Sequence, residues 1–243
     1  MKFLGQRIGF LSLWVLLMTL GTNPSFANSE CLLIANGTPI KLDILKSLAP
    51  GKTVIALDGA VKTLKNRYQN AVLPDLILGD FDSSGHEDRG HFNEAKQLHN
   101  PDPNTTDLEK GILYCLNAKA PIIWIVNALG PKRFDHLLAN IDFLKQYSTA
   151  STEIKLVGDK EIIEYVENRT IRFEGKTGKA AGIFGAPEGL VTTHGLKYEM
   201  KETRVAAGVF RSSSNYLENA EVSITVVGKV LVTYPHRLAP VKH

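Results

Sequence analysis

The segment Leu76-Ile77-Leu78-Gly79-Asp80-Phe81-Asp82-Ser83 places a short apolar run directly before two carboxylates. The run at 76–78 predicts a buried strand. Side chains alternate along an extended backbone, so Asp80 and Asp82 are expected on one side of the strand end and Phe81 on the other. Two such carboxylates repel each other unless a cation lies between them, and Mg²⁺ commonly bridges carboxylates to substrate phosphates. The alternative interpretation is an Asp-rich turn stabilised by local hydrogen bonds.

Other apolar runs of the same kind lie on both sides of this strand. They are rich in Val, Ile and Leu and show little alternation, which is typical of strands buried on both faces of a parallel sheet. The runs cover 31–35, 53–57, 122–126 and 153–157. Helical patterns between the runs cover 40–48, 60–68, 106–117 and 134–147. This alternation predicts a doubly wound, mostly parallel α/β domain.

Polar residues follow each predicted strand. They are Asn36-Gly37, Asp58-Gly59, Asp80 with Asp82, Asn127 with Arg133, and Gly158-Asp159. Ligands of open α/β sheets bind outside the carboxyl ends of the strands. The sequence therefore predicts a polar cleft at this edge of the sheet.

After about residue 160 the pattern changes to short, alternating segments punctuated by Gly and Pro, at 161–166, 170–173, 180–184, 189–193 and 222–227. No long helical period occurs there, which predicts an all-β sandwich or barrel domain. We therefore expect an α/β domain at 28–160 and a β domain at 161–243.

The first 27 residues form a separate segment. Lys2 and Arg7 precede an apolar stretch at 8–20, and Ser25-Phe26-Ala27 offers small residues for cleavage. This pattern predicts a secretory signal peptide rather than a membrane span, because the apolar part is short. The alternative is a start site further along the chain, for example at Met18. The mature chain is expected to have no membrane segment.

Composition excludes some classes of protein. The formal net charge of the 243 residues is +3, and no run of Lys or Arg stands out. Nucleic-acid binding is therefore not expected. Cys31 and Cys115 provide neither a disulfide framework nor a zinc site. Both lie in apolar surroundings, which predicts two buried thiols.

A helix is expected to begin at Thr106-Asp107. Thr106 with Glu109 fits a capping box. Asp107 could be a first-turn acid that is stabilised by the helix dipole. It could also supply a third carboxylate to a Mg²⁺ site at the same sheet edge.

Another helix is expected to begin after Arg133. The Arg133 guanidinium could clamp phosphate oxygens in a fork, or could form an ordinary ion pair with Asp135. Phe134 and Leu138 follow helical spacing and are predicted to be core residues. No Walker A motif, GxGxxG, nucleophile elbow or zinc spacing occurs. Ser214-Asn215, taken alone, favours an exposed turn.

In combination these residues resemble the thiamine pyrophosphokinase (thiamine diphosphokinase) family. The resemblance spans roughly residues 31–235. It is carried by Asp58-Gly59, Gly79-Asp80-Phe81-Asp82-Ser83, Thr106-Asp107 with Leu108-Glu109-Lys110, Arg133-Phe134-Asp135-His136 with Leu138-Ala139-Asn140, Gly195-Leu196-Lys197-Tyr198 and Ser214-Asn215. The chain departs from the family pattern at Ala60, Asn104, Asn127 and Tyr216. The departures bear on the nucleotide and substrate contacts more than on the carboxylates.

The resemblance implies an α/β nucleotide-binding catalytic domain followed by a thiamine-binding β-sandwich. It also implies a homodimer, with each active site between the α/β domain of one subunit and the β domain of the other. In the implied reaction, thiamine attacks the β-phosphorus of ATP and AMP leaves. Two alternatives remain: a diphosphokinase acting on a pterin alcohol, and an exported thiamine-binding protein. ATP chemistry favours the cytoplasm, whereas the N-terminus favours export.

The resemblance also implies roles for particular residues. Asp80, Asp82 and Asp107 would hold Mg²⁺, and Arg133 would stabilise phosphate charge. Asp135 would orient Arg133 or accept a hydrogen bond from the substrate. Contacts to the nucleotide would come from Asp58, Gly59, Thr106 and Arg133. Ser214 and Asn215 would hydrogen-bond the pyrimidine ring of thiamine.

Overall fold

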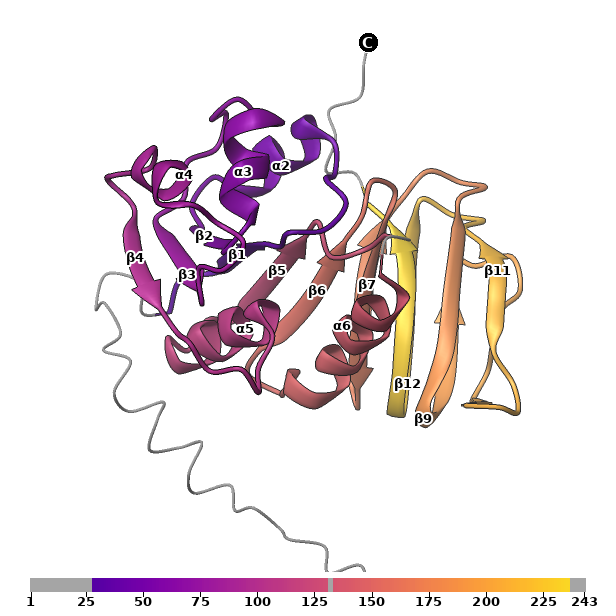
Figure 1. The fold of residues 1–243 in the computed structure, drawn as a ribbon. Coiled ribbons are helices and arrows are strands. Elements are labelled where there is room, and N and C mark those ends of the chain that lie inside the picture. The colour runs from indigo at the N-terminus through magenta and orange to yellow at the C-terminus, as the bar shows by residue number, and fades with distance from the viewer. Residues whose placement is uncertain (1–27, 131–132, 237–243) are drawn as a thin grey trace, which may run out of the picture.

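The computed structural model (Figure 1) describes residues 28–130 and 133–236, and the predicted signal peptide lies outside them. The α/β elements are β1 (Cys31–Ile34), α2 (Leu42–Leu48), β2 (Thr53–Leu57), α3 (Ala60–Asn66), β3 (Leu76–Gly79), α4 (His86–Gly90), β4 (Lys96–His99), α5 (Asp107–Asn117), β5 (Ile122–Val126), α6 (Phe134–Tyr147) and β6 (Glu153–Val157). The remaining elements are β7 (Glu161–Glu167), β8 (Thr170–Glu174), β9 (Ala180–His194), β10 (Thr203–Ala206), β11 (Ser212–Tyr216) and β12 (Glu221–Pro235).

The predicted α/β alternation is confirmed. Six strands are parallel and lie in the order β6-β5-β1-β2-β3-β4. The five predicted strands match β1, β2, β3, β5 and β6, and the four predicted helices match α2, α3, α5 and α6. Strand β4 was missed because its sequence, Lys-Gln-Leu-His, is polar and mostly exposed. The short helix α4 was also missed.

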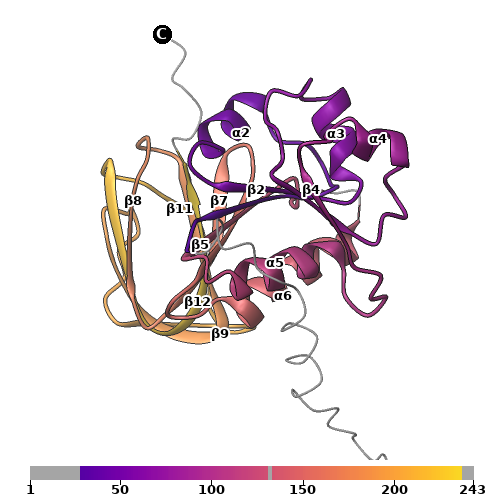
Figure 2. The same ribbon diagram turned by 90° about the vertical axis from the view of Figure 1, so that its left-hand side faces the viewer.

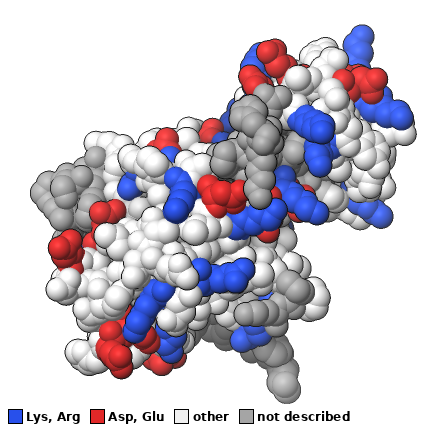
Figure 3. All heavy atoms as spheres, turned by 90° about the horizontal axis from the view of Figure 1, so that it is seen from above, with Lys and Arg blue, Asp and Glu red and all other residues white. Residues whose placement is uncertain are grey.

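Helices cover both faces of the parallel sheet. Figure 2 shows α2, α3 and α4 on one face and α5 and α6 on the other. Leu32 and Ile34 pack with residues of α2 and α3. Leu33, between them, packs with Ile112 of α5 on the opposite face. Both faces of the strand therefore need apolar side chains, which explains the continuous apolar runs. Over α2–α4, Figure 3 shows basic and acidic side chains interspersed.

The antiparallel strands continue the same sheet. Strand β7 pairs antiparallel with β6, and the ladder proceeds through β12 and β9 to β10, with β8 on β12 and β11 on β9. The predicted strands at 180–184 and 189–193 are parts of one long strand, β9. The β strands curl away from the α/β layers in Figure 2. A domain boundary near residue 160 remains a prediction.

The predicted core residues of α6 are partly wrong. Phe134 is 69% exposed and Leu138 is 65% exposed, whereas Phe143 and Leu144 are buried. The helix therefore packs on the sheet through its later turns. Helical spacing identifies an apolar face but does not show where along the helix the sheet ends.

The prediction of two free thiols is wrong. Cys31 and Cys115 are buried, as expected, but they form a disulfide between β1 and α5. Both side chains lie in the apolar layer between the sheet and α5, where strand and helix bring them together. Separation by 84 residues hides this proximity in the sequence. Among the described residues, no helix is long and apolar enough to cross a membrane.

Candidate active site

A cavity lies where the strand order reverses. Strands β2, β3 and β4 continue from one side of β1, and β5 and β6 from the other. Such a switch point opens a crevice at the carboxyl ends of the strands. The cavity there has a volume of about 380 Å³ and is lined by the loops after β1 and β5 and the first turns of α5 and α6. The predicted polar cleft is therefore present.

The two loops that line the cavity approach each other closely at two glycines. A Cβ on Gly37 would overlap the Asn127 carbonyl oxygen, and a Cβ on Gly130 would overlap the Thr38 side chain. Side chains at these two positions would force the loops apart. The polar walls of the cavity therefore depend on glycine at 37 and 130.

A cluster of three carboxylates lies beside this cavity. Asp58 follows β2, Asp80 follows β3, and Asp107 opens α5. Their candidate ligand oxygens all lie within 4.8 Å of one another. A Cβ on Gly79 would lie 2.7 Å from the Asp58 Cβ and 3.2 Å from Asp107 Oδ1. The absence of a side chain at Gly79 therefore lets the three carboxylates come together. We call Asp58, Asp80 and Asp107 the acidic cluster.

Asp82 lies outside the acidic cluster. Phe81 has a φ of 65°, so the backbone turns there and the expected extended conformation is wrong. The Asp82 amide donates to Asp80 Oδ1 at 3.2 Å, and the exposed Asp82 carboxylate accepts from the Ser83 hydroxyl at 2.8 Å. The local hydrogen bonds are those of an Asp-rich turn, the alternative interpretation of this segment. A metal-binding role for Asp82 remains a prediction.

Asp58 is the most constrained member of the acidic cluster. It is 1% exposed and has a φ of 36°, a conformation that few non-glycine residues adopt. Its Oδ2 accepts from the Ser83 amide at 2.9 Å and its Oδ1 from the Ser84 hydroxyl at 2.5 Å. The buried Arg89 guanidinium in turn donates to the Ser84 carbonyl and lies over the Phe81 ring. These contacts fix the loop after β3 against the end of β2.

Lys110 is a basic residue in contact with the acidic cluster that sequence reasoning did not select. Its Nζ lies 3.1 Å from Asp107 Oδ1 and 3.5 Å from Asp80 Oδ2. Burial raises the pKa of Asp107, and the Lys110 hydrogen bond opposes this shift. The hydrogen bond from the Asp82 amide lowers the pKa of Asp80, with a further contribution from Lys110. The three-residue spacing from Asp107 was the available sequence signal.

Thr106 is the N-cap of α5, as the sequence predicted. Its hydroxyl accepts a hydrogen bond from the Glu109 amide at 3.2 Å, which satisfies one free donor of the first turn. The Glu109 carboxylate accepts from the Tyr147 hydroxyl. Thr106 also lines the cavity. Capping therefore fixes the helix end that carries Asp107.

Arg133 and Asp135 form a bidentate pair before and within the first turn of α6. The Arg133 Nε and Nη2 donate to the Asp135 carboxylate at 2.9 and 2.5 Å. These bonds hold the pKa of Asp135 well below its usual range and raise that of Arg133. Both side chains are 63% exposed, so the pair is worth little for stability. Arg133 also lines the cavity, together with His136.

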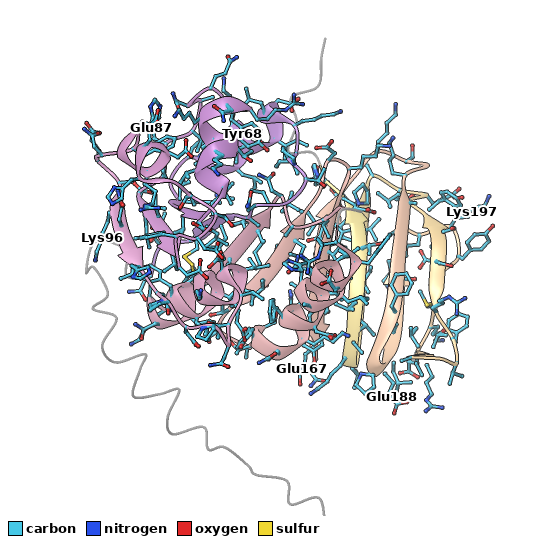
Figure 4. All side chains as sticks on the ribbon, in the orientation of Figure 1. Tyr68, Glu87, Lys96, Glu167, Glu188 and Lys197 are labelled. Atoms are coloured by element: carbon cyan, nitrogen blue, oxygen red, sulfur yellow. A yellow bond between two sulfur atoms is a disulfide. The ribbon has the colours of Figure 1, made fainter. Side chains whose placement is uncertain are left out.

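Asn127, one of the departures from the family pattern, holds the loop after β1. It has a φ of 60°, which Asn tolerates better than most residues. Its Oδ1 accepts from the Ile40 amide at 2.9 Å and from the Tyr68 hydroxyl at 3.0 Å. Figure 4 shows Tyr68 in the layer of α2 and α3. The asparagine therefore links the end of β5 to the segment between β1 and α2 and to Tyr68, just after α3.

The residues with predicted thiamine contacts lie far from this cavity within one chain. Ser214 is exposed and Asn215 is buried, and both belong to the edge strand β11 rather than to a turn. Six steps across the sheet separate β1 from β11, which corresponds to roughly 25–30 Å along the sheet. Figure 4 shows Lys197 at that end of the molecule. The structure does not bring the two groups of site residues together in one chain.

The amide group of Asn215 is fully engaged within the chain. Its Oδ1 accepts from the amides of Tyr198 and Tyr216, and its Nδ2 donates to the Tyr198 carbonyl and the Ser212 hydroxyl. Asn215 therefore fixes the segment that carries the exposed Tyr198. A direct contact from Asn215 to a ligand remains a prediction.

The fold and the site together define an α/β protein with an attached antiparallel β region. A cavity and the acidic cluster lie at the carboxyl ends of its parallel strands. The model of the thiamin pyrophosphokinase catalytic domain matches residues 45–157, and that of the thiamin pyrophosphokinase vitamin B1 binding domain matches residues 169–231. The chain belongs to the thiamin pyrophosphokinase family.

Individual relatives agree with the family models. Thiamin pyrophosphokinase 1 of Caenorhabditis elegans is 29% identical over 69% of this chain and 72% of that protein. Thiamine pyrophosphokinase 1 of Arabidopsis thaliana is 30% identical over 66% of this chain. The match spans 63% of that plant protein, less than two thirds of its length. The structure of Bacillus subtilis thiamine pyrophosphokinase superposes with a TM-score of 0.73 over 85% of this chain and 98% of that chain. At 21% identity, this superposition shows the fold alone.

Proposed function

We propose that the protein is a thiamine diphosphokinase that uses ATP to convert thiamine to thiamine diphosphate. The observation that carries the proposal is the acidic cluster beside the cavity at the switch point of the sheet. The hydroxyl oxygen of thiamine attacks the β-phosphorus of ATP and loses its proton. The bond from the β-phosphorus to the α–β bridging oxygen breaks, and AMP leaves. Such a transfer requires positioning and charge neutralisation more than covalent catalysis.

Mg²⁺ fits the donor set of the acidic cluster. Three carboxylates supply hard oxygen ligands, and their separations of up to 4.8 Å approach the roughly 4 Å across an octahedral Mg²⁺ site. Asp80 and Asp107 would hold the ion together with Asp58. Asp82, at the adjacent turn, would bind it directly or through water. The ion would neutralise charge on the triphosphate.

The loops around the cavity support nucleotide binding. We assign nucleotide contacts to Asp58, Gly59 and Thr106. The Arg133 guanidinium would exchange part of its pairing with Asp135 for phosphate oxygens, because a planar fork binds both groups in the same way. Asp135 then orients Arg133 before the nucleotide arrives. Both side chains are exposed, so this exchange requires little desolvation.

The separation between the cavity and β11 supports a site shared between two copies of the chain. We propose a homodimer in which the β region at 161–243 of one subunit supplies thiamine contacts to the α/β region at 28–160 of the other. Ser214 would contact the pyrimidine ring. Asn215 would act mainly by fixing Tyr198, since its own amide is engaged. The exposed Phe134 and Leu138 beside Arg133 give this cavity rim an apolar surface for the second subunit.

Two alternative functions are less well supported. The vitamin B1 binding model at residues 169–231 favours thiamine over a pterin alcohol. The retained acidic cluster and Arg133 favour a working kinase over an exported binding protein. Compartment is a separate question. ATP-dependent chemistry favours the cytoplasm, whereas the Cys31–Cys115 disulfide and the signal-like N-terminus favour an oxidising compartment.

Turnover by protein expressed from Asn28 tests this function. Thiamine, ATP and Mg²⁺ should yield AMP and thiamine diphosphate. Asp80→Asn should lower kcat at least about a hundredfold, because it removes charge where the triphosphate charge must be neutralised. Asp142→Asn, on the exposed side of α6, is the matched control and should retain activity. Saturable thiamine binding without any turnover would instead support the binding protein.

A further inference from the structure

The side chain of Lys110 is far more buried than the side chains of an ordinary ion pair on a helix surface. Its side chain is 1% exposed, and its Nζ contacts both Asp107 and Asp80. Lys145 forms a pair with the same three-residue spacing to Asp142 on α6, but those side chains are 40% and 68% exposed. Exposed helical pairs of this kind contribute little to stability. A desolvated ammonium requires close anionic partners, and Lys110 has two of them.

The other basic groups near the acidic cluster are directed elsewhere. Arg89 reaches the Asp58 carboxylate only through Ser84, and Arg133 pairs with Asp135. Among the described residues, the ion pairs to the cluster are those of Lys110. Three ionised carboxylates and one ammonium carry a formal charge of −2. One divalent cation would neutralise that charge.

Lys110 bridges two carboxylates much as a metal ion would. In two-metal phosphoryl-transfer sites, a second divalent cation lies roughly 3.5–4 Å from the first and shares carboxylates with it. We propose that Lys110 is a built-in cation of the acidic cluster, so that the cluster binds one divalent ion rather than two. This inference rests on the metal role in the proposed function. Lys110 acts on the metal as a positioning residue, through Asp80 and Asp107.

Counting bound ions tests the inference without any turnover. Mn²⁺ alone, without nucleotide, is titrated into protein expressed from Asn28, and bound ions are counted by electron paramagnetic resonance and calorimetry. The wild type should bind one Mn²⁺ per acidic cluster. Lys110→Met should bind its first Mn²⁺ at least about tenfold more tightly, because a nearby positive charge is gone. The variant should also take up a second ion. Lys145→Met is the matched control and should bind Mn²⁺ as the wild type does.

A charge-retaining variant separates charge from packing. Lys110→Arg should bind one Mn²⁺ with nearly wild-type affinity. In the presence of a chelator, Lys110→Met should melt at a lower temperature than the wild type, and Mn²⁺ should raise its Tm by more. Equal Mn²⁺ binding by the Met and Arg variants would overturn the inference, as would failure of Lys110→Met to fold with Mn²⁺ present.

The same Mn²⁺ titrations separate the inferred role of Lys110 from the proposed metal site. Asp80→Asn should weaken Mn²⁺ binding in every case. If the wild type binds no Mn²⁺, or if Asp80→Asn leaves binding unchanged, the metal role in the proposed function fails together with the inference. If the wild type binds one Mn²⁺ that depends on Asp80 and Lys110→Met binds identically, only the role of Lys110 is overturned.

Discussion

Reduction of the Cys31–Cys115 disulfide should strongly lower the stability of the fold. The bond joins β1 to α5 across a sequence separation of 84 residues. Closing a loop of that length in the unfolded chain corresponds to about 4–5 kcal/mol. For a chain of this size, the loss of that free energy lowers Tm by roughly 10–18 °C. The acidic cluster should survive at lower temperature, because the contacts of Asp58, Asp80 and Asp107 do not involve either cysteine.

The assay is differential scanning calorimetry with and without a phosphine reductant. A Cys31→Ala/Cys115→Ala double variant is the control, since its Tm should be low and insensitive to the reductant. Thiol titration in denaturant should find no free thiols in the unreduced wild type. Two titratable thiols, or a wild-type Tm that reductant shifts no more than it shifts the control, would refute the reasoning.

Four further predictions concern single side chains. Asp58→Asn should lower Mg²⁺-dependent kcat by more than Asp82→Asn does, because Asp58 belongs to the acidic cluster and Asp82 does not. Steady-state kinetics of the two variants measure this, with Tm as the control for folding. A larger loss of kcat in Asp82→Asn would instead make Asp82 the principal metal ligand. Arg133→Lys should lower kcat/KM for ATP about tenfold or more, since the lysine ammonium cannot replace the planar, bidentate guanidinium. Its Tm should change little, because the site is exposed. Unchanged kinetics would contradict a contact between Arg133 and the phosphates. Asn127→Ala should destabilise the fold by about 1–3 kcal/mol in urea unfolding, because it leaves the buried Ile40 amide without its acceptor, whereas the Tyr68 hydroxyl keeps the Ile40 carbonyl. Leu73→Ala, at an exposed apolar site, should cost much less. Burial and the nearby Glu167 raise the pKa of Tyr165 from 10.0 to about 12. The contribution of Tyr165 to the free energy of unfolding is therefore present below pH 10 and is lost as pH rises toward 12. Tyr165→Phe should flatten the dependence of unfolding free energy on pH between 10 and 12, and an unchanged dependence would contradict the raised pKa.

The sequence predicted much of the fold because its information there is local. Continuous runs such as 53–57 and 122–126 became central strands with their predicted bounds, and Thr106 became the N-cap of α5. Strand β4 was not predicted, because pairing at a sheet edge does not require apolar side chains. The exposure of Phe134 depends on where the sheet ends beneath α6, which helical periodicity does not encode.

The site was only partly predictable, because backbone turns decide which side chains meet. Phe81 has a positive φ, and Asp82 does not lie on the same side as Asp80. Asp58 also has a positive φ, and its carboxylate is part of the acidic cluster. Phe81 is not a residue type that favours a positive φ, so the sequence carried no signal for its turn, whereas Asp58-Gly59 marks a turn but not which way the carboxylate points. Asn215 was predicted from the family resemblance to contact thiamine, since the residues alone favoured an exposed turn. Its full set of internal hydrogen bonds depends on residues 198 and 212, which are brought close only by the fold.

The most direct test of the central claim is to follow the bridging oxygen of ATP. Protein expressed from Asn28 is supplied with thiamine, Mg²⁺ and ATP labelled with ¹⁸O between the α- and β-phosphorus, and the products are examined by ³¹P NMR and mass spectrometry. Attack on the β-phosphorus predicts equal amounts of AMP and thiamine diphosphate, with the label in AMP. Formation of ADP with thiamine monophosphate, or label retained in thiamine diphosphate, would contradict the proposed reaction.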